Sequence, residues 1–152
     1  DCISLTDVSA DALLQLAATV ESGTNHPLAT AILDAIQEKE LPLLSGSDYQ
    51  TEAGLGVSAN VAGKRVLLGN RDWLKAQGVV MIPNHAEPLL EQGKTVVYLA
   101  SDGQLLGMIA LQDQLRPDAL STVRQLKELG LEVILMTGDH DVIAQAIAKQ
   151  LG

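Results

Sequence analysis

The sequence predicts an α+β fold, an antiparallel sheet flanked by helices, followed by a partial α/β segment. Two stretches with helical periodicity come first, over residues 9–20 and 27–36. From Tyr49 onward apolar residues alternate with polar ones, which is typical of strands. After residue 112 the order changes to helix, apolar run, polar turn and helix, which indicates one unit of a parallel sheet. We therefore divide the chain into domains 1–112 and 113–152.

Local signals set the ends of the predicted elements. Ser9 is a favourable N-cap for the first helix, Gly23 ends it, and Pro27 suits the first turn of the second. Residues 41–48 contain Pro, Gly and Ser, and are predicted to form a loop. A hairpin is predicted at 57–61 with 65–68. Two short helices follow, at 71–77 after the cap Asn70 and at 83–91. A second hairpin is predicted at 95–101 with 104–111, around the turn Asp102-Gly103.

The C-terminal segment is predicted to be one unit of a larger sheet. Arg116-Pro117 opens a helix that Gly130 closes. A buried strand at Val133–Met136 then leads into the polar turn at 137–140 and a final helix. Because one strand cannot form a sheet, we expect this unit to be incomplete and the chain to be part of a longer protein.

Composition excludes several classes of function. The formal charge is −9, which argues against nucleic acid as a partner, because phosphates require a basic surface. Cys2 is the only cysteine and the three histidines lack zinc spacing, so no metal site is predicted. No apolar run approaches the roughly 18–20 residues of a membrane span. We expect a monomeric chain in the cytosol.

The sequence Glu-Ser-Gly-Thr-Asn-His-Pro-Leu, residues 21–28, lies between the two predicted helices. The residue before a proline favours extended geometry, so His26 is expected just outside the second helix, at a fixed corner. Glu21, at the end of the first helix, could converge on the same space. An imidazole and a carboxylate placed this way can recognise a flat, hydrogen-bonding ligand. The alternative is a capping loop with a solvent-facing histidine.

Three further motifs are candidate ligand contacts. Missing side chains at Gly54 and Gly56 would let a ligand approach the backbone, although paired glycines also form ordinary turns and bulges. Asn70 could present its amide to a ligand or simply cap a helix. Thr137 and Asp139 follow the predicted buried strand, at the edge where α/β sheets bind ligands. Their alternative is a polar turn in which Asp139 caps the last helix.

Together these motifs resemble the heavy-metal-transporting P-type ATPases, and most closely the copper exporters. The matching stretches are Glu-x4-His-Pro-Leu at 21–28, Gly-Leu-Gly-Val at 54–57, Val-Leu-Leu-Gly-Asn-Arg-Asp-Trp-Leu at 66–74 and Met-Thr-Gly-Asp at 136–139. They occur in the order and spacing of that family and cover nearly the whole chain. The resemblance implies that residues 1–112 are a nucleotide-binding domain and 113–152 part of a haloacid-dehalogenase-like phosphorylation domain.

The resemblance also implies roles for the candidate residues. Glu21 and His26 would engage adenine, Gly54 and Gly56 would let the nucleotide lie against the backbone, and Asn70 would orient it. Thr137 would bind the transferred phosphoryl group, with Asp139 in the same motif. The implied ligands are ATP or ADP with Mg²⁺, whose protein ligands would lie mostly outside this sequence. The implied partners are the phosphorylation, actuator and transmembrane domains of the same ATPase, which makes this a cytosolic domain of an integral membrane protein.

The sequence departs from the family pattern in two ways. Thr24-Asn25 replaces the usual Ser-Glu before His-Pro, and His140 replaces the usual Asn after Thr-Gly-Asp. The Asp-Lys-Thr segment with the phosphorylated aspartate is absent from this sequence, so we expect it to bind ATP without hydrolysing it efficiently. Two alternatives remain open at this point, a free-standing phosphatase of the haloacid-dehalogenase type and a non-catalytic interaction module.

Overall fold

The structure is a computed structural model that describes residues 1–24, 27–80, 86–112, 115–138 and 141–152. It divides into two compact units. The first comprises Asp1–Asn84 and Val96–Leu111, and the second His85–Thr95 and Gln112–Gly152. Among the described residues, no helix is both long and apolar enough to cross a membrane.

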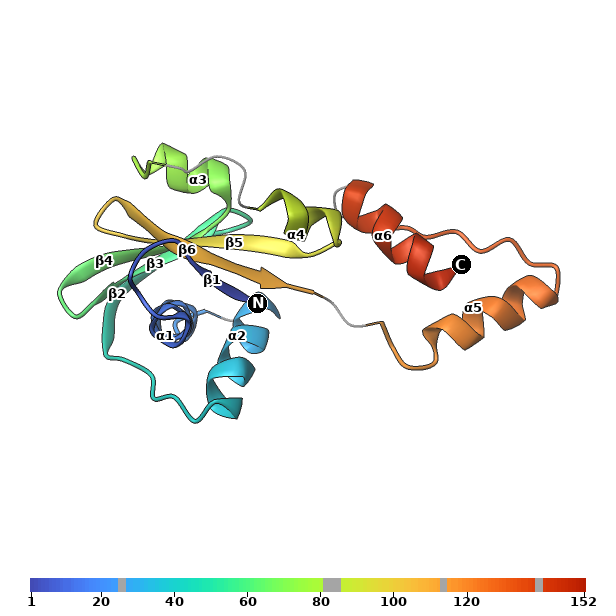
Figure 1. Cartoon of the computed structure of the whole chain (residues 1–152), viewed down its shortest axis with the longest axis horizontal. Coiled ribbons are helices and arrows are strands. Elements are labelled where there is room, and N and C mark those ends of the chain that lie inside the picture. Colours follow the sequence, from blue (N-terminus) through green and yellow to red (C-terminus); the bar gives the residue numbers. More distant parts are fainter. Residues whose placement is uncertain (25–26, 81–85, 113–114, 139–140) are drawn as a thin grey trace. The chain divides into compact units, whose positions relative to one another are not determined.

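The first unit is built on a six-stranded sheet with the order β1-β6-β5-β4-β3-β2 (Figure 1). The pairs β1–β6, β2–β3, β3–β4 and β4–β5 are antiparallel, which confirms the predicted sheet type. Positive φ angles at Ala62-Gly63 and Asp102-Gly103 form the tight turns of the two predicted hairpins. The strands are β1 (Cys2–Ser4), β2 (Gly46–Glu52), β3 (Gly56–Val61), β4 (Lys64–Gly69), β5 (Thr95–Ser101) and β6 (Gln104–Leu111).

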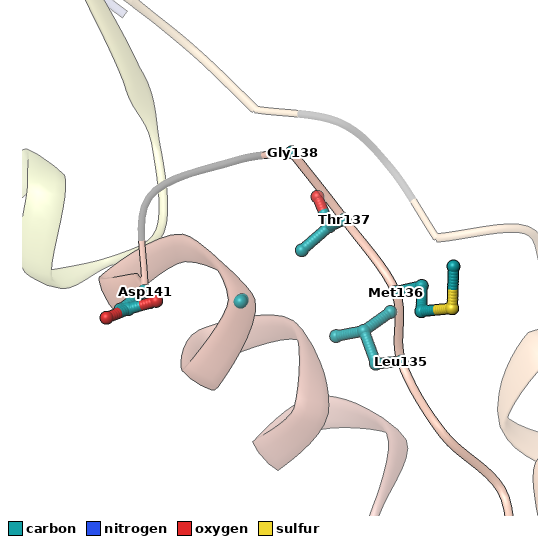
Figure 2. Close-up of a pocket in the computed structure, with 6 residues that line it drawn as sticks. Leu135, Met136, Thr137, Gly138 and Asp141 are labelled. Atoms are coloured by element: carbon teal, nitrogen blue, oxygen red, sulfur yellow. The ribbon is translucent and has the colours of Figure 1, made fainter.

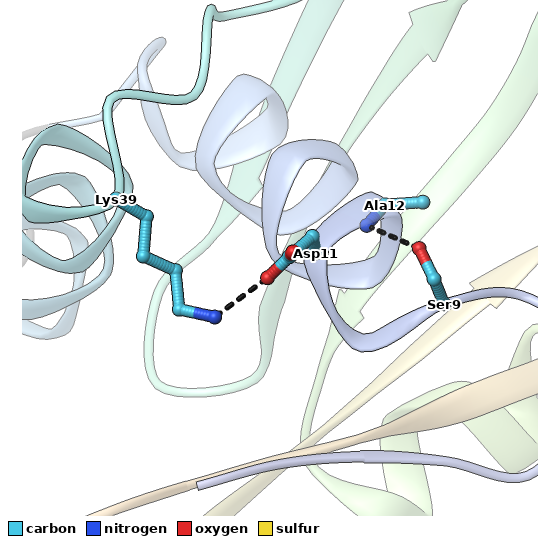
Figure 3. Close-up of polar contacts among 4 residues, drawn as sticks. All are labelled: Ser9, Asp11, Ala12 and Lys39. Carbon is cyan, nitrogen blue, oxygen red and sulfur yellow. Dashed lines mark hydrogen bonds and ion pairs between the residues drawn. The ribbon is translucent and has the colours of Figure 1, made fainter.

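Helices α1 (Ala10–Glu21) and α2 (Pro27–Glu38) cover one face of this sheet (Figure 1). Ser9 caps α1 as predicted, because its hydroxyl accepts a bond from the N–H of Ala12 at 3.1 Å (Figure 3). Lys39, just after α2, pairs with Asp11 of α1 at 2.6 Å, in an exposed ion pair that contributes little to stability (Figure 3).

The apolar faces of both helices and one face of the sheet form a single core. Each fully buried aliphatic side chain contributes about 1.5–3 kcal/mol to folding. Since the protein has no Phe, this core is made almost entirely of aliphatic side chains. Its buried members include Leu13, Val20, Ile32, Val57, Leu68, Leu99 and Ile109.

The opposite face of the sheet carries the short helix α3 (Arg71–Ala76), as Figure 1 shows. Asn70 is its N-cap, as predicted, and accepts a bond from the N–H of Trp73 at 2.8 Å. Trp73 and Leu74 are buried beneath the helix. The face with α3 is the one on which the side chains of Gly56 and Gly69 would project, since neighbouring Val57 and Leu68 belong to the core on the other face.

The second unit contains three helices within its described residues, and α6 contacts both of the others. Gly93, which follows α4, allows the chain to approach α6 closely, because a Cβ added at Gly93 would lie 2.7 Å from the Cβ of Ala146. The helices are α4 (Glu87–Glu91), α5 (Ala119–Glu128) and α6 (Asp141–Leu151).

The predicted buried strand at Val133–Met136 is wrong. Residues 131–137 form neither strand nor helix, and Ile134 and Met136 are 73% and 90% exposed. A strand forms only where a neighbour supplies hydrogen-bond partners, and none of the described strands pairs with this segment. The apolar run is therefore strand-like in composition but finds no partner strand in the part of the chain that the structure describes.

The sequence prediction missed β1 and placed the change to strand periodicity only at Tyr49, within β2. Strand β2 begins at Gly46, inside the predicted loop at 41–48, and β1 pairs Ile3 with Met108 at one edge of the sheet. The side chains of β2 are almost all exposed, so the start of the strand, before Tyr49, lacks the apolar alternation that reveals a half-buried strand. Of the predicted helix at 83–91, the structure has Glu87–Glu91 as α4, and residues 81–85 lie outside the described part of the chain.

Candidate functional site

The first candidate group lies at the C-terminal end of α1. Glu21 is the last residue of the helix and is only 5% exposed. The hydroxyl of Thr24 donates to its Oε2 at 2.7 Å, and the N–H of Thr24 donates to its carbonyl at 2.9 Å. A hydrogen bond from a hydroxyl to a carboxylate fixes the direction of the acid. Thr24 therefore orients Glu21, and a hydroxyl residue three positions after the acid is the sequence signal for this role.

His26, the predicted partner of Glu21, lies outside the described residues, as does Asp139, the predicted companion of Thr137. Pro27 is the first residue of α2, as its preference for the first helical turn predicts.

The second group brings together Gly54, Gly56 and Asn70. The amide nitrogen of Asn70 donates to the carbonyl of Gly54 at 3.4 Å, and its backbone N–H donates to that of Leu55 at 2.9 Å. Gly54 has a φ of 75° and nothing within 4 Å of where a Cβ would lie. This turn is consequently open, and a flat ligand could approach its backbone.

Gly56 is a different kind of glycine, because protein atoms already fill the space beside it. Gly56 pairs with Gly69 across β3 and β4, and both lie against the ring of Trp73. A Cβ on Gly56 would come 2.5 Å from Cε3 of Trp73 and 2.7 Å from the carbonyl oxygen of Leu68. The two glycines of the motif thus serve separate purposes, an open turn at Gly54 and a packing contact at Gly56.

Two polar groups are buried next to these glycines. Tyr98 pairs with Gly69, and burial raises the pKa of its phenol although the positive charge of Arg71 partly opposes this. The phenol therefore stays protonated at physiological pH. The indole Nε1 of Trp73 is buried without a hydrogen-bond partner in the described structure, at a cost of about 1–3 kcal/mol.

Strand β2 connects the two groups. Its residue Tyr49 packs against Gly23, two residues after Glu21, and its residue Glu52 pairs with Gly56. Three residues of strand span about 10 Å. Of the bonds described, none joins Glu21 to Gly54 directly.

The third group lies in the second unit, where Thr137 and Gly138 precede α6. They line an open depression of about 560 Å³, together with Leu135, Met136, Asp141 and Ala144. Leu135 and Thr137 lie on the side of their segment that faces α6, while Met136 lies on the other side (Figure 2). Thr137 thus lines the same depression as Asp141, the first residue of α6.

Comparison with known proteins identifies the family. The family model for haloacid dehalogenase-like hydrolases matches residues 4–152. The silver exporting P-type ATPase of Salmonella typhimurium is 35% identical over 99% of this chain. The copper-exporting P-type ATPase of Bacillus subtilis is 37% identical over 92% of it. The chain spans 18% of the length of each of these two relatives.

Solved structures agree with this assignment. A zinc-transporting PIB-type ATPase in the E2.Pi state has a TM-score of 0.76 and 35% identity, with 99% of this chain and 24% of that chain covered. The N-domain of HMA6, a copper-transporting P-type ATPase, has a TM-score of 0.59 and 31% identity, with 73% and 93% covered. The chain is thus homologous to the cytosolic portion of membrane P-type ATPases. It belongs to the haloacid dehalogenase-like hydrolases and, among them, is the nucleotide-binding region of a heavy-metal P-type ATPase.

Proposed function

We propose that residues 1–112 bind ATP and position its triphosphate for transfer to an aspartate that lies outside this sequence. Residues 113–152 would then contribute Thr137 and Asp139 to the phosphorylation domain of the same protein. The metal moved by the whole ATPase would be a heavy metal, and copper is our proposal because the sequence motifs resemble the copper exporters most.

The observations that support this proposal are the oriented, buried carboxylate of Glu21 and the open turn at Gly54, which strand β2 links. Its carboxylate can accept a bond from the exocyclic amine of adenine, and His26 would stack on or bond to the base. The Gly54 turn would lie against the nucleotide. The side-chain amide of Asn70 lies at the same turn, because it donates to the carbonyl of Gly54. In this arrangement the chain grips the base and ribose and leaves the phosphates free, as positioning for phosphoryl transfer requires.

Charge predicts the strength of binding. With a formal charge of −9, the chain should gain little from the phosphates. We therefore expect a Kd for ATP between roughly 10 µM and 1 mM, which corresponds to about 4–7 kcal/mol. ADP should bind within about tenfold of ATP, and a much larger loss on removing the γ-phosphate would contradict a site built around adenine.

Mg²⁺ would accompany the triphosphate rather than be bound by this chain. No group of three or more His, Cys, Asp or Glu that could hold a metal is present among the described residues. We therefore assign no Mg²⁺-dependent step to these residues.

Calorimetric titration with nucleotide tests the proposed site. His26→Gln should weaken ATP binding while the urea unfolding curve stays unchanged. Glu21→Ala should reduce the preference for ATP over GTP. The matched control is Glu38→Ala, because Glu38 also ends a helix but is exposed. An unchanged Kd in His26→Gln and an unchanged ATP/GTP ratio in Glu21→Ala would reject the site.

A further inference from the structure

Tyr49 is the one aromatic side chain of strand β2, and two glycines make room for it. A Cβ on Gly23 would lie 2.4 Å from its Cδ1, and a Cβ on Gly46 would lie 2.3 Å from its Oη. Contacts below 3.0 Å are not tolerated by real Cβ atoms, so both positions need glycine while Tyr49 keeps its place. The ring therefore stands between the turn after α1 and the start of β2.

An irregularity in β2 aims Tyr49 at this place. The register with β3 shifts between Ser47 and Gln50, and Asp48 has a φ of 53°. Asp48 is held in this conformation by the side chain of Asn60, whose Nδ2 donates to its Oδ2 at 2.8 Å. Bulges of this kind re-aim the side chain that follows them.

The chain leading into β2 is itself fixed to α1. The N–H of Leu44 donates to the hydroxyl of Thr19 at 3.1 Å, and that hydroxyl donates to the carbonyl of Gln15 at 2.7 Å. Tyr49 thus contacts the 22–24 turn from a strand that is held on both sides. Before it, Leu44 is bonded to Thr19 of α1, and after it, Glu52 pairs with Gly56 of β3.

We propose that Tyr49 is a positioning residue for the nucleotide site, which holds the turn carrying Glu21 and Thr24 in register with the Gly54 turn. This inference rests on the proposed function, since a positioned acid matters only if it meets a ligand. The aromatic ring supplies the contact. Among the described bonds the phenol oxygen makes none, so Phe should replace Tyr49 without loss.

Three variants test the inference. Tyr49→Ala removes the ring, Tyr49→Phe keeps it, and Gly23→Ala displaces it without truncating any side chain. Gly23 does not have a positive φ, so alanine is acceptable there to the backbone. We expect Tyr49→Ala and Gly23→Ala to raise the Kd for ATP about five- to twentyfold and to lower the ATP/GTP ratio, with Tyr49→Phe unchanged.

Hydrogen exchange gives a second measurement that does not depend on nucleotide. The amide of Thr24 is bonded to the carbonyl of Glu21, and its exchange should accelerate in Tyr49→Ala and Gly23→Ala, but not in Tyr49→Phe. Wild-type exchange and a wild-type Kd in Tyr49→Ala would overturn the positioning role. A wild-type chain that binds no nucleotide would instead defeat the proposed function, and the Thr24 amide would still show whether Tyr49 holds the turn.

Discussion

Gly56→Ala is the substitution that best separates packing from ligand binding at the glycine motif. The added methyl would lie 2.5 Å from Cε3 of Trp73, whereas ordinary contact begins at 3.4 Å. The ring would have to move by about 0.9 Å, the difference between these distances. Trp73 is 5% exposed, so there is little free space for it to enter. Forcing a methyl group into a packed site costs about 1–3 kcal/mol.

The assay is urea unfolding followed by circular dichroism, because two proteins of the series lack Trp73, the only tryptophan. A double-mutant cycle with Trp73→Leu isolates the contact, because the leucine removes the ring atoms that the methyl would meet. The cycle should show a coupling of about 1 kcal/mol between Gly56→Ala and Trp73→Leu. Trp73→Leu should relieve only part of the destabilisation caused by Gly56→Ala, because the carbonyl of Leu68 would remain 2.7 Å from the new methyl.

Gly54→Ala is the matched control. Its Cβ would meet nothing within 4 Å, and its cost of about 1–2 kcal/mol should come only from the φ of 75°. That cost should add to the cost of Trp73→Leu without coupling. A Gly56→Ala variant as stable as wild type, or one whose loss simply adds to that of Trp73→Leu, would refute the packing role.

Thr24→Val should raise the Kd for ATP several-fold, because Glu21 loses the bond that directs it, while Thr24→Ser should match wild type in the same titration. Alkylation of Cys2 by iodoacetamide should be slow at pH 8, because burial raises the pKa of its thiol above the ordinary 9.0, and urea should accelerate it. Since the unfolded thiol ionises first, the fold should lose stability as the pH rises above 9.0, and Cys2→Ser should remove this part of the loss. Ile134→Ser should change the urea midpoint little because Ile134 is 73% exposed, whereas Leu99→Ala, at a fully buried site, should cost about 2–5 kcal/mol.

Local chemistry made most of the first unit predictable. The Asp102-Gly103 turn, the Ser9 and Asn70 caps and the proline at the start of α2 each act within a few residues, so their signals are readable in the sequence. The start of β2, before Tyr49, could not be recognised, because residues 46–48 of this edge strand show no apolar alternation.

Relations between distant residues were beyond prediction. The need for glycine at position 56 comes from Trp73, and the need at position 23 comes from Tyr49. Neither partner is marked by spacing, since each reaches its glycine only after the chain has folded back. At residues 133–136 the sequence predicted a strand that does not form. Apolar composition indicated the strand, but a strand forms only where it can pair with a neighbour.

The pairing of β1 with β6 has a consequence for how the first unit can be joined to other structure. Cys2 lies opposite Ile109, and the amino group of Asp1 donates to the carbonyl of Ala110 at 2.8 Å. The first and last residues of this unit therefore lie at the ends of neighbouring strands, whose spacing is about 4.8 Å. A domain with this geometry can be inserted into a loop of another domain. The two ends of that loop would then lie little farther apart than the two ends of a tight turn.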